Sequence, residues 1–226
     1  MSSDQATATL QNIPSGHQLV KLPSGTIIEC DMAPPPIRAY TTDERESKAK
    51  LALCLHPWSW LGGCMDDPVL RLLVGPLNSL GYHRWKSSGW PSLTGSREAQ
   101  DLRELVQWAI DRLHSVESVV LVGYSYGSLI ASLHPPLPHP KVSHIMISYP
   151  LTLTALVRDD RARVLIVHGD HDDFTDAEIY EAWTRSLAEA AAESVLEVVK
   201  VEGATHFWRE GEARVKLVET IETWLT

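Results

Sequence analysis

The chain has 226 residues, of which 44% are hydrophobic, enough for one sizeable core. Its net charge of −9 and the lack of a basic cluster exclude a typical nucleic-acid partner. No apolar run of about 18 residues is present, so no membrane span is expected. Polar residues 1–12 lack the apolar core of a secretory signal, and we expect a flexible leader followed by one domain at 13–226. Three cysteines without a Cys-x-x-Cys pair favour a reducing, cytoplasmic setting.

The first half of the chain predicts a hairpin followed by alternating strands and helices. Strands are expected at 17–22 and 26–32, joined by a Pro-Ser-Gly turn. The polar, Pro-rich stretch 33–50 is expected to be an exposed connection. The unbroken apolar run 51–55 is typical of a strand buried on both faces of a parallel sheet. A helix at 67–80, a weaker strand at 82–86 and an amphipathic helix at 96–114 complete this half.

The second half continues the alternation. Strands are predicted at 118–122, 142–148, 163–167 and 195–201, with helical stretches at 128–133, 176–193 and 210–225. The Pro- and His-rich loop 134–140 is expected to expose His134 and His139 to solvent. Such alternation predicts an α/β fold with a doubly wound, mostly parallel sheet. Loops after the strands should therefore meet at the carboxyl edge of the sheet, where such folds hold their active sites.

The most informative of these loops is Gly-Tyr-Ser-Tyr-Gly at 123–127, which follows the apolar strand 118–122 and precedes a helical stretch. A strand, a sharp turn and a helix around Gly-x-Ser-x-Gly are typical of a nucleophile elbow. The pattern makes Ser125 the candidate nucleophile. The backbone N–H of Tyr126, the next residue, is then expected to contribute to an oxyanion hole.

A serine nucleophile needs a histidine base, and the base needs a carboxylate to hold it. His206 is the candidate base, because it follows the strand 195–201 in a Gly-Ala-Thr-His loop. The acid is expected after the strand 163–167, where three aspartates compete. The candidates are Asp170, Asp172 and Asp173. The alternative role of such aspartates is to cap the next helix or to solvate the loop.

The three loops occur in the order serine, acid, histidine. With them, the sequence resembles the α/β-hydrolase superfamily over nearly the whole chain. The segment 56–67, His-Pro-Trp-Ser-Trp-Leu-Gly-Gly-Cys-Met-Asp-Asp, resembles the His-Pro-x-x-x-x-Gly-Gly-x-Met-Asp-Asn loop of a family of small, lid-poor predicted hydrolases. The chain departs from it at Asp67, where Asn is usual, and at 87–92, where an Arg-Gly-x-Gly-x-Ser run is usual. The few residues between Pro150 and Arg163 imply a minimal or absent lid.

The resemblance implies that the acid is the last residue of the His-Gly-x-x-Asp loop, so we prefer Asp172, then Asp173, then Asp170. It also indicates the second donor of the oxyanion hole. The second oxyanion-hole N–H is expected from Trp58, with Ser59 as second choice, since Pro57 has no N–H. A substrate pocket is expected to include Trp58, Ser59, Trp60, Trp90 and Phe207. The tryptophans, Trp85 among them, either line this pocket or pack beneath a loop. His56 is expected to be structural, with its ring bonded to the loop backbone.

The sequence therefore predicts a serine hydrolase that cleaves an ester or thioester of a small acyl compound, including one carried on a partner protein. Two alternatives remain. The same fold can host acyl transfer, cyclisation, isomerisation or lyase chemistry. The cluster of His and Asp side chains from His168 to Asp173 has the composition of a metallohydrolase site, although the remaining ligands are missing. No cofactor motif is present, and no cofactor is expected.

Overall fold

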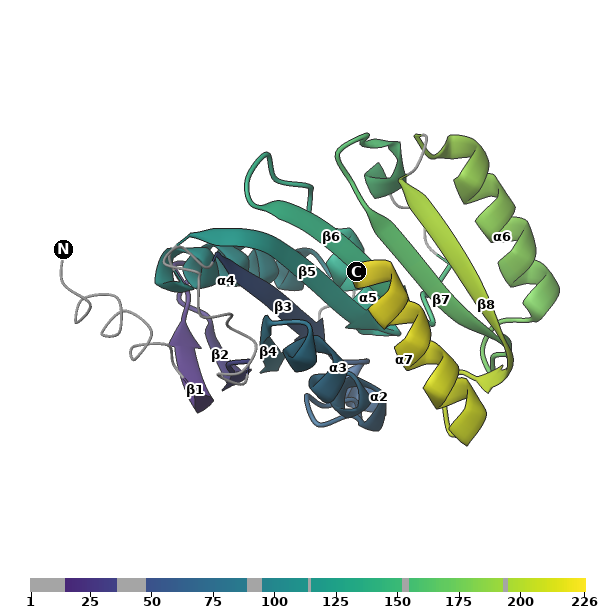
Figure 1. Ribbon diagram of the computed structural model, residues 1–226, viewed down its shortest axis with the longest axis horizontal. Helices are drawn as coiled ribbons and strands as arrows, with labels where there is room; N and C mark the ends of the chain where they lie inside the picture. Colours follow the sequence, from purple (N-terminus) through teal and green to yellow (C-terminus); the bar gives the residue numbers. More distant parts are fainter. Residues whose placement is uncertain (1–14, 36–47, 89–94, 114, 152–154, 193–194) are drawn as a thin grey trace.

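The computed structural model describes residues 15–35, 48–88, 95–113, 115–151, 155–192 and 195–226 (Figure 1). The expected leader at 1–12 and most of the expected connection at 33–50 lie outside them. Within the described residues the strands form one eight-stranded sheet in the order β1-β2-β4-β3-β5-β6-β7-β8. The strands are β1 (Gly16–Lys21), β2 (Ile27–Ala33), β3 (Ala49–Leu55), β4 (Tyr82–Ser88), β5 (Val116–Tyr124), β6 (Lys141–Ile147), β7 (Val164–His171) and β8 (Leu196–Thr205).

Most neighbouring strands in this sheet are parallel. Only β2 runs against its neighbours: it pairs antiparallel with β1 and with β4. Parallel pairing joins β4 to β3 and continues through β5, β6 and β7 to β8. Parallel strands require crossover connections, and helices lie between them along the chain. The mostly parallel α/β sheet predicted from the sequence is confirmed.

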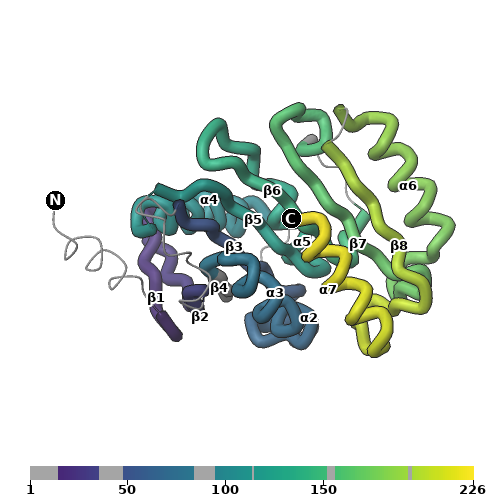
Figure 2. The backbone as a smooth tube through the Cα atoms, viewed as in Figure 1, coloured from purple at the N-terminus to yellow at the C-terminus, as the bar shows by residue number. Residues whose placement is uncertain are grey.

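Helices cover both faces of the sheet (Figures 1 and 2). They are α2 (Pro68–Leu72), α3 (Val74–Ser79), α4 (Ser96–Leu113), α5 (Tyr126–Ser132), α6 (Ala177–Ala190) and α7 (Gly211–Leu225), with the 3-10 turns η2 (Ser59–Leu61) and η3 (Ala155–Arg158). One core joins α2, α3 and α7 to the face that carries Cys54 and Val122. A second joins α4 and α5 to the opposite face at Leu53 and Leu121, and a third holds α6. The central strands are apolar on both faces because both faces are covered.

Two features of this arrangement bear on function. Between the end of β6 and the start of β7, the described residues form no helix larger than η3, so the expectation of a minimal lid is confirmed. In the part of the chain that the structure describes, no helix has the length and apolar character that a bilayer crossing requires.

The predicted helix at 67–80 is in fact two short helices. Asp67 caps the first of them, with its side chain accepting a hydrogen bond of 2.8 Å from the Val69 N–H. The first helix ends at Leu73, and the second, α3, contains Pro76. Proline has no N–H for the bond to the residue four positions earlier, and its ring collides with that carbonyl. The apolar residues therefore keep the spacing of a single helix, although the backbone forms two.

The expectation that His134 is exposed is wrong, whereas His139 is exposed. Only 2% of the His134 surface is accessible, and its ring lies 6.4 Å from the buried ring of His144 on β6. Its Nδ1 lies 2.8 Å from the Pro135 carbonyl, while His144 Nε2 lies 3.0 Å from the His134 carbonyl. The backbone partner offsets part of the cost of burying this polar ring.

Candidate active site

Ser125 lies on the sharp turn between β5 and α5. Its backbone has φ 53° and ψ −119°, a region that residues other than glycine rarely adopt. Backbone hydrogen bonds hold the turn: the Ser125 N–H donates to the Ile147 carbonyl at 2.8 Å, and the Ser128 N–H donates to the Ser125 carbonyl at 2.9 Å. Strain of this kind persists only where the surroundings enforce it, and it is common at active sites.

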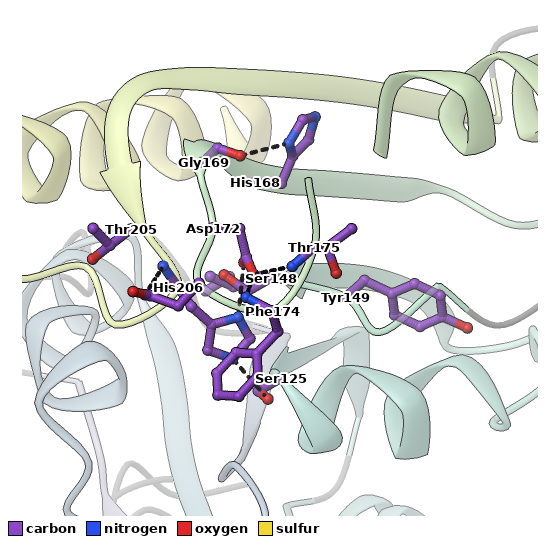
Figure 3. Close-up of polar contacts among 12 residues, drawn as sticks. Ser125, Ser148, Tyr149, His168, Gly169, Asp172, Phe174, Thr175, Thr205 and His206 are labelled. Carbon is purple, nitrogen blue, oxygen red and sulfur yellow. Dashed lines mark hydrogen bonds and ion pairs between the residues drawn. The ribbon is translucent and has the colours of Figure 1, made fainter. Parts of the chain in front are cut away.

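The structure brings the three predicted side chains Ser125, Asp172 and His206 together (Figure 3). His206 Nε2 lies 3.1 Å from Ser125 Oγ, and His206 Nδ1 lies 2.7 Å from Asp172 Oδ2. The histidine and aspartate side chains are only 11% and 3% exposed. A carboxylate can only accept, so Nδ1 carries the proton, and in the neutral ring Nε2 faces the serine hydroxyl as an acceptor. This is the arrangement in which a histidine can withdraw a serine proton.

The three competing aspartates have different partners. Asp172 alone contacts the His206 ring, and its other oxygen accepts from the Phe174 and Thr175 N–H groups at 2.9 and 3.2 Å. Burial acts to raise the pKa of Asp172, but the hydrogen bonds from His206 and these N–H groups outweigh it and lower the pKa. Asp170 accepts from the Gly203 N–H at 2.7 Å, and Asp173 accepts from the His206 N–H at 3.2 Å.

Glycines allow the three loops to approach one another closely. A Cβ on Gly169, at the end of β7, would lie 1.9 Å from the Ala204 carbonyl oxygen on β8. A Cβ on Gly127 would lie 2.2 Å from the Leu55 carbonyl oxygen at the end of β3. Gly169 therefore sets the spacing between the aspartate and histidine loops, and Gly127 sets the spacing between the elbow and the loop after β3.

We expect Gly169→Ala to destabilise the protein by about 3 kcal/mol or more, because a methyl group has no space against a backbone carbonyl of the central sheet. Gly211→Ala is the matched control: no atom lies within 4 Å of its Cβ position, and alanine suits the start of α7. Urea unfolding measures both variants. Equal unfolding midpoints for the two would contradict this account of Gly169.

Sequence reasoning missed several contacts that hold His206. The Tyr124 hydroxyl donates to the His206 carbonyl at 2.9 Å. Two residues further on, Trp208 is fully buried with φ 51°, and its indole N–H donates to Ser148 Oγ at 3.0 Å. The position of Tyr124 beside the nucleophile was the only available signal, since these contacts join segments more than 50 residues apart.

The predicted oxyanion-hole residues, Tyr126 and Trp58, belong to α5 and to the loop after β3. Tyr126 is the first residue of α5 and directly follows Ser125. Trp58 directly precedes η2, in the loop that the close approach of Gly127 holds against the elbow. The Trp58 ring stacks between Tyr126 and Trp60, with centroids 5.9 and 5.6 Å away. Burial lowers the pKa of His56, whose Nδ1 lies 2.6 Å from the Pro57 carbonyl, a backbone contact expected for a structural histidine.

The other predicted pocket residues differ in their placement. Ser59 is half-buried, and Trp60 is 61% exposed at the outer end of the stack. Phe207 is 41% exposed, with its ring 5.5 Å from that of His206. Trp90 lies outside the described residues. The sequence also missed Phe174, which is 65% exposed and meets the His206 ring edge-on at 4.6 Å.

The His and Asp cluster of the metal alternative does not converge on one point. The His168 ring is buried and stacks on Tyr180 at 3.9 Å, while His171 pairs with Asp170 and Asp172 turns toward His206. Among the described residues, no group of three or more His, Cys, Asp or Glu side chains is arranged to hold an ion.

No family model matches the chain. It is 25% identical over 209 residues to an uncharacterised protein of Schizosaccharomyces pombe, an alignment that covers 83% of this chain and 89% of the relative. The narrower likeness to lid-poor predicted hydrolases therefore stays a prediction.

Solved structures resemble the chain over almost its full length. An α/β serine hydrolase homologue from Coxiella burnetii has a TM-score of 0.74 at 21% identity, covering 95% of this chain and 99% of that one. A serine hydrolase without a lid from Xanthomonas campestris has a TM-score of 0.71 at 19% identity, covering 94% of this chain and 95% of that one. A thermophilic esterase from Thermogutta terrifontis, with propionate bound, has a TM-score of 0.71 at 14% identity, covering 93% of each chain. The chain therefore has the fold of the α/β-hydrolase superfamily, in the form that lacks a lid domain.

Proposed function

We propose that this protein is a serine hydrolase that cleaves an ester or thioester through an acyl-enzyme. The observation that carries the proposal is the unbroken chain of contacts from Ser125 Oγ through both nitrogens of His206 to Asp172, at 3.1 and 2.7 Å. The likeness in fold to serine hydrolases and an esterase supports the same chemistry.

Each residue would then have a defined role. Ser125 Oγ attacks the acyl carbonyl while His206 Nε2 takes the hydroxyl proton. The backbone N–H groups of Tyr126 and Trp58 stabilise the oxyanion. His206 passes the proton to the departing alcohol or thiol, and Asp172 stabilises the charged ring meanwhile. A water molecule that His206 activates then releases the acid from Ser125. Apart from this water, residues of the chain itself carry out these steps.

The openness of the site favours a dispersed substrate. Among the described residues no lid element covers the site, and the aromatic side chains Trp60, Phe174 and Phe207 beside it remain exposed. An enzyme with an open site should act on dispersed substrate and show no activation at a lipid interface. We therefore propose dispersed esters and thioesters as substrates, either free or carried on a partner.

Fluorophosphonate labelling tests the proposal. We expect one adduct on the wild-type protein, located on Ser125 by peptide mass analysis and absent from Ser125→Ala. The same variant should lose hydrolysis of short acyl esters by at least about a thousandfold. A folded wild-type protein that takes no label and cleaves neither esters nor thioesters would overturn the proposal.

A further inference from the structure

Two exposed aromatic side chains, Phe174 and Phe207, contact the ring of His206, which faces Ser125. Among the exposed large hydrophobic side chains of the described residues, three are aromatic: Trp60, Phe174 and Phe207. The chain has only two phenylalanines, and both lie against the His206 ring. Phenylalanine is usually buried, so two exposed rings at one catalytic histidine mark a surface for an apolar ligand.

The two sides of Ser125 differ in the chemistry that they face. The stack of Trp58 and Trp60 lies on the side of the expected oxyanion hole, in contact with Tyr126. Phe174 and Phe207 lie on the side of His206, with ring centroids 4.6 and 5.5 Å from the imidazole. In Figure 3 the Phe174 ring lies beside the His206 ring, close to Ser125.

The reaction assigns a substrate group to the His206 side. His206 must give its proton to the oxygen of the leaving group, so that oxygen comes within hydrogen-bond distance of Nε2. The atoms attached to it must then pass close to the rings that border the imidazole. Phe174 and Phe207 therefore border the path of the departing alcohol.

We propose that Phe174 and Phe207 form a binding subsite for an aromatic leaving group, so that the preferred substrates are esters of alcohols that carry an aromatic ring. This inference rests on the proposed serine-hydrolase function. The two rings are 5.8 Å apart and inclined at 64°, an edge-to-face arrangement against which a third aromatic ring can pack. The guanidinium of Arg209 lies 4.9 Å from the centre of the Phe207 ring and steadies it.

Acetate esters with leaving alcohols of similar acidity provide the test: benzyl acetate, cyclohexylmethyl acetate and ethyl acetate. We expect the wild-type protein to cleave benzyl acetate with the highest kcat/KM. Phe174→Ala and Phe207→Ala should each lower kcat/KM for benzyl acetate by about three- to tenfold, mainly through KM. Ethyl acetate should change by less than about twofold, because its two-carbon leaving group has no ring to pack against Phe174 and Phe207.

Two controls separate this subsite from a disturbed histidine. Leu19→Ala truncates a 75% exposed side chain on β1, remote from the site, and should alter no substrate. Fluorophosphonate carries a small leaving group, so it should label Ser125 at the wild-type rate in both Phe variants. Ethyl phenylacetate, in which the ring is on the acyl side, should keep its wild-type kcat/KM.

The outcomes are distinct. An equal loss for all esters and slower labelling would mean that the rings only support His206. A loss of kcat/KM confined to ethyl phenylacetate would place the subsite on the acyl side. An unchanged kcat/KM for benzyl acetate in both Phe variants would show that the rings form no subsite. Each of these overturns the leaving-group subsite while the serine-hydrolase function stands. Failure of the wild-type protein to label or to cleave any ester would overturn both.

Discussion

Asp172→Asn should lower kcat/KM for ester substrates by about three to four orders of magnitude. The carboxylate lies 2.7 Å from His206 Nδ1 and keeps the proton there, so that Nε2 can accept the proton of Ser125. An asparagine amide can turn its NH2 group toward Nδ1, which selects the opposite tautomer and leaves Nε2 protonated. The geometry would survive but the base would be lost.

The neighbouring aspartates provide matched controls for this prediction. Asp170→Asn and Asp173→Asn remove the same charge from the same loop. The amide oxygen of asparagine can still accept the Gly203 N–H in the first case and the His206 N–H in the second. We expect both to stay within about tenfold of wild type in ester hydrolysis. Asp173→Asn losing as much activity as Asp172→Asn would show that the acid has been misassigned.

The sequence predicted the fold and the three side chains because each carries a local signal. Strands buried on both faces read as continuous apolar runs, and 51–55 is such a run. Ser125 is marked by the glycines that its turn needs. The sequence limited the acid of the site to three aspartates, because all three follow the same strand. Only the side-chain contacts distinguish Asp172 from its two neighbours.

What the sequence could not reveal depends on contacts between distant segments. Phe174 occupies a polar, acidic stretch that reads as a solvated loop. It meets His206 where β7 and β8, which approach closely at Gly169, end side by side. His134 sits among prolines, and nothing local indicates that its ring turns toward His144. Residue types predict burial only on average, so a backbone carbonyl placed by the fold can draw a polar ring inward.

The buried histidines lead to the second large effect, a loss of stability in mild acid. Burial lowers the pKa of His83 and of His134 to about 4, and that of His144 to about 3. His144 shows the physical reason most clearly. Its Nε2 must donate to the His134 carbonyl, and its Nδ1 is buried with no hydrogen-bond partner. Protonation would place a second N–H and a full charge where neither is satisfied.

The direction follows from proton linkage. Above about pH 6.5 these rings are neutral in both the folded and the unfolded states, and the full stability is present. As the pH falls below that value, the unfolded chain takes up protons that the folded protein does not. Each buried histidine then removes about 1.4 kcal/mol per pH unit until its folded-state pKa is reached. Three of them would remove about 6 kcal/mol at pH 5, a large part of a typical folding free energy.

Urea unfolding at pH 7.5, 6 and 5, followed by circular dichroism, measures this loss. His144→Gln keeps a donor for the His134 carbonyl and does not titrate, so the slope of unfolding free energy against pH should fall by about one proton. A loss of packing lowers the unfolding free energy equally at every pH, so only the charge effect changes this slope. His17→Gln, at a side chain that is 60% exposed, should leave the slope unchanged. An unfolding free energy that stays constant from pH 7.5 to 5 would mean that these rings reach solvent or gain a partner when they are protonated.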